Sequence, residues 1–550
     1  MINCKRSVDL IVLAVILVAE VATVGQIPDR SKVVAGAEKV FERLSKTNPM
    51  PAPGCAVGVS LNGESVFEKA FGLAEMEHNI PNSAQTIFES GSVAKQFTAA
   101  ALVLLQQDGK LDLDDPVRKY IPELPDYGSP LTIRHLLNHT AGLRDWGAVM
   151  SLTGAGRGDR VVTQAIALDV IYRQKYLDFV PGAEYSYSNS GYQLAAEIVE
   201  RVSKQKFTTF TEERLFKPLG MRNTSWRDNY QRIVSGRAQA YARQGNGPWM
   251  LNMPIMNVYG NGGMLTTVGD WLKWNAMLDA KTWNANLVDE LETQGVLNDG
   301  RKISYALGVV VETAKDGNKD ITHGGSTAGY QTFLARFPDK KLSVAVLCNA
   351  SSANPGGIAY GIFDEIYGRP ADTAKVETVA VSEDVLKKFA GVWKNDVTRN
   401  ANSIALDKGE LKINGTALKP IADGSFMLGE RKLTFKDGSP ITATIANPDG
   451  SMTRLTQVAE WKPSAKDLTE FTGTWKSDEA QTQFSLVAEG DKLFIVNTPV
   501  IRLPLQPIYK DHFAAQGYVV WVTRDKKGKI ERLHVGTGRM RDMFFERIGK

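Results

Sequence analysis

The chain has 550 residues, of which 43% are hydrophobic and 23% charged, the composition of an ordinary globular protein. At roughly 150 residues per domain, this length predicts several domains. A formal net charge of +4 is too small for this length to indicate a nucleic-acid partner. The sequence has neither a Cys/His cluster of the metal-binding type nor a phosphate-binding glycine loop, so we expect no metal and no cofactor.

The N-terminus has the pattern of an export signal. Lys5 and Arg6 precede an unbroken apolar stretch, and small residues follow as far as Gly25. This arrangement is typical of a secretory signal, and the apolar stretch is short for a membrane span. We predict a signal peptide over residues 1–25 and an exported protein, periplasmic or secreted, that meets the membrane only through this segment. The alternative is an uncleaved N-terminal anchor.

Residues 26–368 are predicted to form one α/β (α+β) domain with an antiparallel sheet flanked by helices. Asn62-Gly63 between two apolar runs is a strong hairpin signal. The expected elements are a helix at 33–44, strands at 55–61 and 65–71, a buried helix from 92 to about 107, a helix at 131–143 with Thr132 at its N-cap, helices through Leu194 and from near Asp270, strands at 304–312, 332–337 and 342–348, and a helix at 357–367.

Two cysteines, Cys55 and Cys348, lie in predicted strands. Cysteines in such runs are more often buried apolar residues than disulfide partners, although export would permit a disulfide. We therefore expect two buried cysteines and leave their pairing open.

The C-terminal part contains an internal repeat. Residues 369–385 are polar and unpatterned, as in a linker, and short strands and turns follow. The pattern Leu-x-x-Phe-x-Gly-x-Trp-Lys ends at Lys394 and again at Lys476, an offset of 82 residues (476 − 394). We predict two small antiparallel β-barrels of one type, at 386–462 and 463–550. The alternative is a single larger β-domain.

Three short patterns in the first domain could carry chemistry. They are Ser92 with Lys95, Tyr187 with Asn189, and His323-Gly324-Gly325. Residues three apart share one face of a helix, so an unprotonated Lys95 could take the proton of Ser92. Each spacing has a second copy, and spacing alone is therefore not specific. The copies are Ser203/Lys206, Tyr259/Asn261 and His534/Gly536.

The residues around these patterns resemble the penicillin-recognising serine hydrolases. More closely, they are similar to the β-lactamase-related group of class C β-lactamases, D-alanyl-D-alanine carboxypeptidases, D-aminopeptidases and related esterases. The matching stretches, in chain order, are residues 92–97, 133–143, 187–192, 262–267 and 323–325. The resemblance covers about residues 30–368 and implies a β-lactamase/transpeptidase-like fold. Such a domain followed by two β-barrels further resembles the D-aminopeptidase arrangement.

The site residues have the following expected roles. Ser92 attacks a carbonyl carbon and forms an acyl-enzyme, and Lys95 is the base, since a buried site favours its neutral form. Tyr187 passes the proton to the leaving group, and Asn189 hydrogen-bonds the substrate amide or Lys95. The resemblance implies that the backbone N–H groups of Ser92 and Ser326 stabilise the oxyanion.

Other polar residues are expected to support the site. His135 and His139 fit a buried helix beside the site better than they fit a base. Arg144, Asp145 and Trp146 follow that helix and are candidates to line the cleft.

His323 marks a departure that bears on the substrate. Many penicillin-binding relatives carry Lys-Thr-Gly at the third motif, where the cation receives a substrate carboxylate. Here His323-Gly324-Gly325 takes that place, and histidine is mostly neutral at pH 7. Selection for a free carboxylate is thus less expected, which favours aminopeptidase, amidase or esterase chemistry.

The predicted function is that of an exported serine hydrolase acting on a small amide, peptide or ester. The alternative is a non-catalytic sensor of peptidoglycan or β-lactams that retains the fold. A further hypothesis is that a barrel loop reaches over the cleft and limits substrate size. The expected partner is a small-molecule or peptide substrate, and a homo-oligomer is left open.

Overall fold

The computed structural model describes residues 28–48, 50–154, 160–281, 283–314, 317–368, 377–447, 451–497 and 501–549. The predicted signal segment and residues 369–376 of the predicted linker lie outside the described residues. In the described part, we find no helix that is long and apolar enough to span a membrane.

The first domain is built on a six-stranded antiparallel sheet. Its strand order is β12-β13-β14-β15-β1-β2, so strands from both ends of the domain meet in the middle. The strands are β1 (Cys55–Leu61), β2 (Glu64–Phe71), β12 (Val310–Thr313), β13 (Lys319–Thr327), β14 (Tyr330–Phe337) and β15 (Leu342–Cys348). Every residue of β1 and β15 is buried, as expected for central strands covered on both faces.

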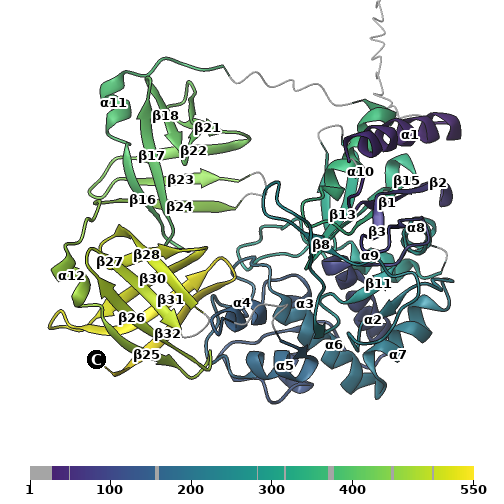
Figure 1. The fold of residues 1–550 in the computed structure, drawn as a ribbon, viewed down its shortest axis with the longest axis horizontal. Coiled ribbons are helices and arrows are strands. Elements are labelled where there is room, and N and C mark those ends of the chain that lie inside the picture. Colours follow the sequence, from purple (N-terminus) through teal and green to yellow (C-terminus); the bar gives the residue numbers. More distant parts are fainter. Residues whose placement is uncertain are drawn as a thin grey trace, which may run out of the picture.

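Helices cover both faces of this sheet (Figure 1). α1 (Arg30–Thr47) and α10 (Pro355–Tyr367) pack on one face, where Val57 and Val59 join their cluster. α8 (Val268–Ala280) packs on the other face, against Gly58. Because successive strand residues point to opposite faces, the apolar side chains of β1 pack against the helices on both faces of the sheet.

α2 (Lys95–Gln107) is the central helix of the remaining helical part. It is buried on all sides from Lys95 to Leu105, as its apolar sequence predicts. The other helices are α3 (Ile133–Leu137), α4 (Trp146–Ser151), α5 (Gln164–Tyr172), α6 (Asn189–Ser203), α7 (Phe207–Thr211) and α9 (Ala285–Leu291), with short helices η1 (Gly91–Ala94), η2 (Val117–Lys119), η3 (Glu212–Phe216) and η4 (Pro338–Lys340). The short strands are β3 (Leu73–Glu75), β4 (Ile80–Pro81), β5 (Phe88–Glu89), β6 (Val162–Thr163), β7 (Ser225–Trp226), β8 (Tyr241–Ala242), β9 (Met250–Leu251), β10 (Met256–Asn257) and β11 (Met264–Thr266).

Two expected elements are shorter than predicted. The helix expected at 131–143 is capped by Thr132, as predicted, but α3 ends at Leu137. His139 then takes a φ of 58°, which no helix accommodates. The strand expected at 304–312 begins only at Val310, after Gly308 with a φ of 80°.

Cys55 and Cys348 form a disulfide, the pairing that the sequence left open. The two residues lie directly opposite each other in the β1–β15 pair, with their Cα atoms 4.0 Å apart. Both are buried, as predicted. Strand register decides this pairing, and register is not visible in two separate apolar runs.

Two β-rich domains follow, which confirms the predicted fold class; the alternative of a single larger β-domain was wrong. After α11 (Glu383–Lys387), nine antiparallel strands form a nearly closed barrel-shaped sheet. These are β16 (Gly391–Asn395), β17 (Ala401–Asp407), β18 (Glu410–Ile413), β19 (Thr416–Ala417), β20 (Lys419–Pro420), β21 (Phe426–Leu428), β22 (Arg431–Lys436), β23 (Thr442–Ala446) and β24 (Met452–Val458).

After α12 (Ala465–Thr469), eight strands form a closed barrel. They are β25 (Gly473–Ser477), β26 (Thr482–Glu489), β27 (Lys492–Asn497), β28 (Ile501–Tyr509), β29 (His512–Ala515), β30 (Tyr518–Arg524), β31 (Ile530–Thr537) and β32 (Met540–Gly549). The repeated tryptophans, Trp393 and Trp475, are fully buried on the first strand of each domain.

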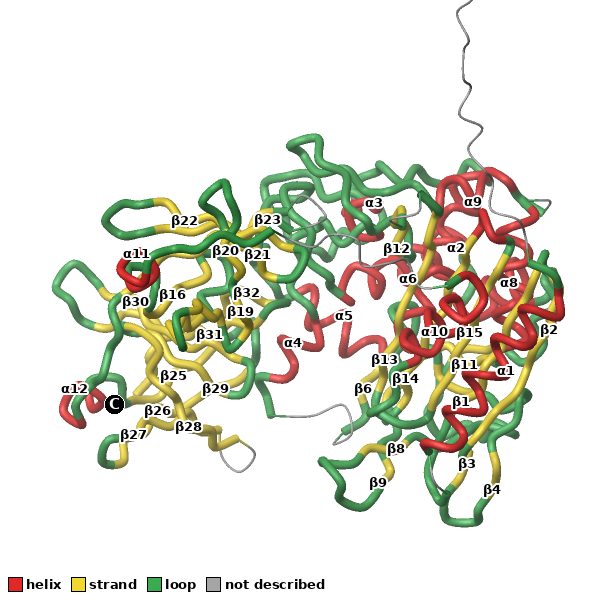
Figure 2. Tube along the Cα trace, turned by 90° about the horizontal axis from the view of Figure 1, so that it is seen from above, coloured by secondary structure: helices red, strands yellow, loops and turns green. Residues whose placement is uncertain are grey.

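The closed barrel docks on the first domain. Figures 1 and 2 show α4 between this barrel and the other helices. The Tyr518 hydroxyl donates to Ser151 Oγ at 2.8 Å, and buried Arg144 pairs with Glu479 at 2.9 Å. One buried apolar cluster runs continuously from the first domain into the barrel. The two domains therefore share a core.

Candidate active site

Ser92 and Lys95 lie next to each other at the start of the central helix. Ser92 is in η1 and Lys95 is the first residue of α2. Lys95 Nζ lies 3.2 Å from Ser92 Oγ, and it also donates to Asn189 Oδ1 at 2.9 Å and to Asn261 O at 2.6 Å. The Lys95 side chain is fully buried. The amine is thus held beside the hydroxyl by acceptors from two other parts of the chain, Asn189 and Asn261.

The segment before Ser92 packs tightly against β13 and β14. Gly91 has a φ of 52°, and a Cβ there would lie 2.5 Å from Ser326 N. A Cβ on Gly325 would lie 2.0 Å from Ser90 O, so both glycines are required. This close approach brings Ser92 and Ser326 to the same cavity, where the resemblance implies an oxyanion site formed by their backbone N–H groups.

The Tyr187 ring lies next to the Lys95 amine. Its ring centroid lies 5.0 Å from Lys95 Nζ and 4.1 Å from the ring of His139. Burial raises the pKa of Tyr187, although its hydrogen bond with Ser92 acts in the opposite direction. At neutral pH the hydroxyl therefore keeps its proton and is able to donate it.

Asn189 begins α6 with its side chain fixed at both ends. Its Nδ2 donates to Asp145 Oδ2 at 2.8 Å, while its Oδ1 faces Lys95. Asp145 is buried outside the cavity and also caps α4 through Gly147 N and Ala148 N. Of the three residues expected to line the cleft, Trp146 does so, Asp145 holds Asn189 instead, and Arg144 pairs with Glu479 instead.

His323 faces the same cavity from β13. Its Nδ1 lies 2.6 Å from Gly324 O and its Nε2 lies 2.9 Å from the Tyr305 hydroxyl. Burial is the largest cause that lowers the pKa of His323 to about 4. The ring is therefore neutral at pH 7, with Nδ1–H donating to the carbonyl and Nε2 accepting from Tyr305.

His135 and His139 both have structural contacts. His135 completes the capping box of α3 with Thr132. His139 is buried and its Nδ1 accepts from Ser188 N at 3.2 Å. Burial holds the pKa of His139 well below its usual value, so this ring is also neutral at pH 7.

The cavity has a volume of about 730 Å³. Ser92, Tyr187, Asn189, the three residues of His323–Gly325 and Ser326 all line it, so the structure brings the predicted residues together. The second copies at Ser203/Lys206 and His534/Gly536 do not line it.

Sequence reasoning missed three residues of the site region, Asn261, Tyr305 and Arg539, and it missed the role of a fourth, Asp145. Asn261 belongs to a duplicate Tyr-x-Asn pattern, yet its carbonyl accepts from Lys95. The glycine-rich loop around Asn261 is the signal that could have found it. Tyr305 contacts His323 through its hydroxyl. Asp145 holds the Asn189 side chain, a role that follows from how the two segments pack and not from a motif. Arg539 lines the cavity from the closed barrel, and no sequence pattern connects it to the other residues.

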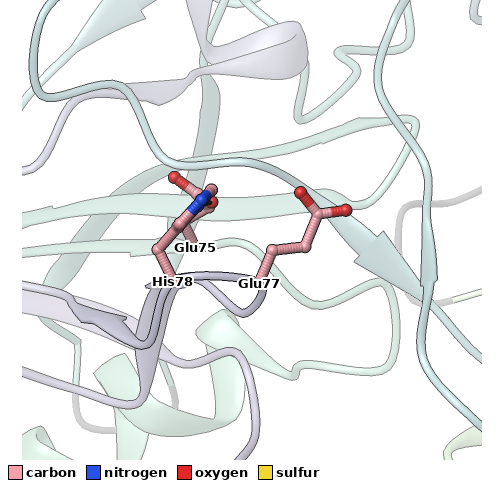
Figure 3. A group of neighbouring side chains, drawn as sticks. All are labelled: Glu75, Glu77 and His78. Carbon is pink, nitrogen blue, oxygen red and sulfur yellow. Dashed lines mark hydrogen bonds and ion pairs between the residues drawn. The ribbon is translucent and has the colours of Figure 1, made fainter.

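A separate surface group could offer ligands to a metal. Glu75, Glu77 and His78 lie around the β3–β4 turn, with one ligand atom of each within 4.8 Å of the others (Figure 3). The hydrogen bond with Glu75 raises the pKa of His78, which favours the imidazolium form that binds no metal at that nitrogen. The group does not line the Ser92 cavity, and we assign no metal to it.

A serine beside a buried lysine, a neutral tyrosine and a Gly-Gly strand segment, all meeting at one cavity, together define a serine hydrolase site. A family model described as Beta-lactamase matches residues 45–365, more than half of the sequence. The chain therefore belongs to the beta-lactamase family.

Individual relatives agree with this assignment. A D-aminopeptidase of Brucella anthropi is 26% identical over 551 residues, covering 94% of this chain and 99% of that protein. Penicillin-binding protein 4* of Bacillus subtilis (strain 168) is 25% identical over 353 residues, covering 60% of this chain and 77% of the relative. The octameric penicillin-binding protein homologue from Pyrococcus abyssi has a similar fold, with a TM-score of 0.56, 20% identity, and coverage of 93% of this chain and 100% of its own.

Proposed function

We propose that this protein is an exported serine hydrolase that cleaves a small amide, peptide or ester through an acyl-enzyme on Ser92. The observation that carries the proposal is the 3.2 Å distance between Lys95 Nζ and Ser92 Oγ in a buried site. Similarity to a D-aminopeptidase over 94% of the chain supports an amide or peptide as substrate.

Lys95 is positioned to act as the base. A neutral amine has two N–H donors and one lone pair. Donation to Asn189 Oδ1 and Asn261 O is compatible with a lone pair that accepts the Ser92 proton. Ser92 Oγ then attacks the substrate carbonyl carbon, and the backbone N–H groups of Ser92 and Ser326 stabilise the oxyanion.

Tyr187 is positioned to act as the acid. Because burial raises its pKa, its hydroxyl carries a proton that it can deliver to the leaving group. Lys95, which took the Ser92 proton, then returns a proton to the Tyr187 phenolate beside it. Water then hydrolyses the acyl-enzyme, with the same groups acting in reverse order.

The disulfide supports the proposed export. Disulfides form and persist in oxidising compartments outside the cytosol. Cys55 and Cys348 are already bonded between two central strands of the sheet. Detection of the mature protein in a periplasmic or culture-medium fraction, with an N-terminus near residue 26, would test this part of the proposal.

The acyl-enzyme can be tested by labelling. The purified protein is treated with a fluorescent fluorophosphonate, and mass spectrometry locates the modified residue. We expect the label on Ser92 and none on a Ser92→Ala variant, whereas Ser203→Ala, in the duplicate pattern, serves as the matched control and keeps the label. Turnover of chromogenic esters without label on Ser92 would contradict the proposal. Binding of a fluorescent penicillin without any turnover would favour the non-catalytic sensor.

A further inference from the structure

The tip of the β31–β32 hairpin reaches from the closed barrel into the Ser92 cavity. Arg539 lies at this tip; its side chain is exposed and lines the cavity. Its backbone is held at both ends: its N–H donates to Thr537 Oγ1 at 3.2 Å, and its carbonyl accepts from Asp145 N at 2.9 Å. The next strand is fixed too, because Arg541 N donates to Asp178 Oδ1 at 2.9 Å. The guanidinium is therefore presented to the cavity by an anchored turn.

Arg539 places a positive charge in the cavity, and none of the described lining residues is acidic. Among the described residues that line the cavity, Arg227 and Arg539 are the charged ones, and none is Asp or Glu. Arg227 is buried and neutralised by Glu89 through two hydrogen bonds of 2.8 Å. Within the described part of the chain, the structure shows no ion pair for Arg539. A substrate anion would find a complementary charge there, and a substrate ammonium group would not.

The contact with Tyr187 shows where the Arg539 guanidinium lies relative to the reacting atoms. Arg539 Cζ lies 4.8 Å from the centroid of the Tyr187 ring. A guanidinium over an aromatic face keeps its N–H donors at its edge, where they suit a carboxylate. Since Tyr187 is the proposed proton donor to the leaving group, the guanidinium lies on the leaving-group side.

We propose that Arg539 receives a carboxylate carried by the leaving group of the substrate. The closed barrel thereby supplies the cation that neutral His323 does not provide at the third motif. The substrate class is an amide or ester whose departing part bears a free carboxylate, such as a depsipeptide with a C-terminal acid. This inference rests on the proposed function, because it uses Ser92 acylation to define the leaving group.

A pair of esters that differ in one group tests the proposal. The probes are N-benzoylglycyl-D-phenyllactate and the same compound with its carboxylate converted to a carboxamide. In both, Ser92 Oγ forms the acyl bond, the ester C–O bond breaks, and the leaving oxygen takes up the proton. We expect the intact protein to cleave the acid with a kcat/KM about 10- to 100-fold higher than the carboxamide, the range of a charge-assisted hydrogen bond.

Two variants of Arg539 and one control test whether Arg539 causes the preference for the acid over the carboxamide. Arg539→Gln should bring the ratio of acid to carboxamide close to one, and Arg539→Lys should keep part of it. Arg532→Gln is the matched control, since this arginine also lies over an aromatic ring, at 4.9 Å from Phe544, but does not line the cavity. A ratio unchanged in Arg539→Gln would overturn the proposal.

Binding separates this inference from the proposed function. In Ser92→Ala protein, which cannot acylate, calorimetry should show the acid binding about 10- to 100-fold more tightly than the carboxamide. Adding Arg539→Gln should remove that difference. Equal binding of the two probes, or no binding of the acid, would overturn the proposal even if Ser92 is labelled. Tight binding of the acid without label on Ser92 would instead contradict only the proposed function.

Discussion

The carboxylate of Asp145 holds Asn189 by two hydrogen bonds of 2.8 Å, one from its backbone N–H and one from its side-chain amide. Because the amide nitrogen is turned toward Asp145, the amide oxygen faces Lys95 at 2.9 Å. A residue outside the cavity thus decides how a residue inside it meets the base.

Asp145 is therefore expected to act as a positioning residue. Asp145→Ala leaves two buried N–H groups of Asn189 without their acceptor, a cost of about 1–3 kcal/mol for each group. We expect kcat for p-nitrophenyl acetate to fall about 10- to 100-fold with KM little changed, and Asp145→Asn to retain part of the activity.

Asp270→Ala is the matched control for this change. Asp270 is an equally buried carboxylate that accepts from Asn223 N and the Thr224 hydroxyl, and it does not line the cavity. This variant should lower the melting temperature without a comparable loss of kcat. Similar losses of kcat in both variants would show a general folding defect and contradict a positioning role.

Lys95 is expected to be irreplaceable by arginine. A guanidinium is always protonated and cannot accept the Ser92 proton, even where its charge and length fit. Lys95→Arg should slow fluorophosphonate labelling of Ser92 by about 1,000-fold or more, within the range for loss of an activating base. Lys206→Arg, in the exposed duplicate pattern, should label at the wild-type rate. Normal labelling of the Lys95→Arg variant would rule out Lys95 as the base.

His323 is expected to make the protein less stable in acid. Its pKa is about 4 in the folded protein and 6.5 as the reference for the unfolded chain. Between these values the unfolded chain binds a proton that the folded protein does not, so stability falls as pH drops from 6.5 toward 4. The full effect is about 3 kcal/mol.

Calorimetry at pH 7.5 and 4.5 measures this effect. The drop in melting temperature between the two pH values should be smaller in His323→Gln than in the wild type. His78→Gln is the control of opposite sign, because hydrogen bonding with Glu75 raises the pKa of that exposed histidine. An unchanged drop in His323→Gln would show that His323 is not protonated differently in the two states.

The disulfide is expected to stabilise the first domain. It closes a loop with a sequence separation of 293 residues. In the chain-entropy account, a loop of this length contributes about 5–6 kcal/mol, or about 5–10 °C in melting temperature for a domain of this size. Calorimetry of Cys55→Ala/Cys348→Ala against the oxidised protein measures the contribution. A double variant that melts at the wild-type temperature would contradict it.

Local sequence signals predicted the elements well. Asn62-Gly63 predicted the hairpin of β1 and β2, and the apolar run after Ser92 predicted the buried helix α2. These succeed because turn chemistry and hydrophobic periodicity act over a few residues. The end of α3 was missed because the positive φ of His139, a buried residue, is not visible in the local apolar pattern.

The site was predictable where the signal is local to a motif. Ser92 and Lys95 share one turn, and their flanking residues carry the family resemblance. Contacts set by packing were not predictable. The Cys55–Cys348 bond depends on strand register, and Arg539 reaches the cavity only because the closed barrel docks on α4.

The docking of that barrel also couples two equilibria. The Asp145 N–H is bonded to the Arg539 carbonyl, so the barrel position and the arrangement around Asn189 are joined by one backbone contact. Any ligand that binds better to the docked arrangement must strengthen docking by the same factor, since linkage is reciprocal. The closed barrel then acts on the hydrolase domain as a covalently attached effector. Ligand binding in the cavity should therefore be detectable as a stronger contact between the two domains, at the interface where Arg144 pairs with Glu479.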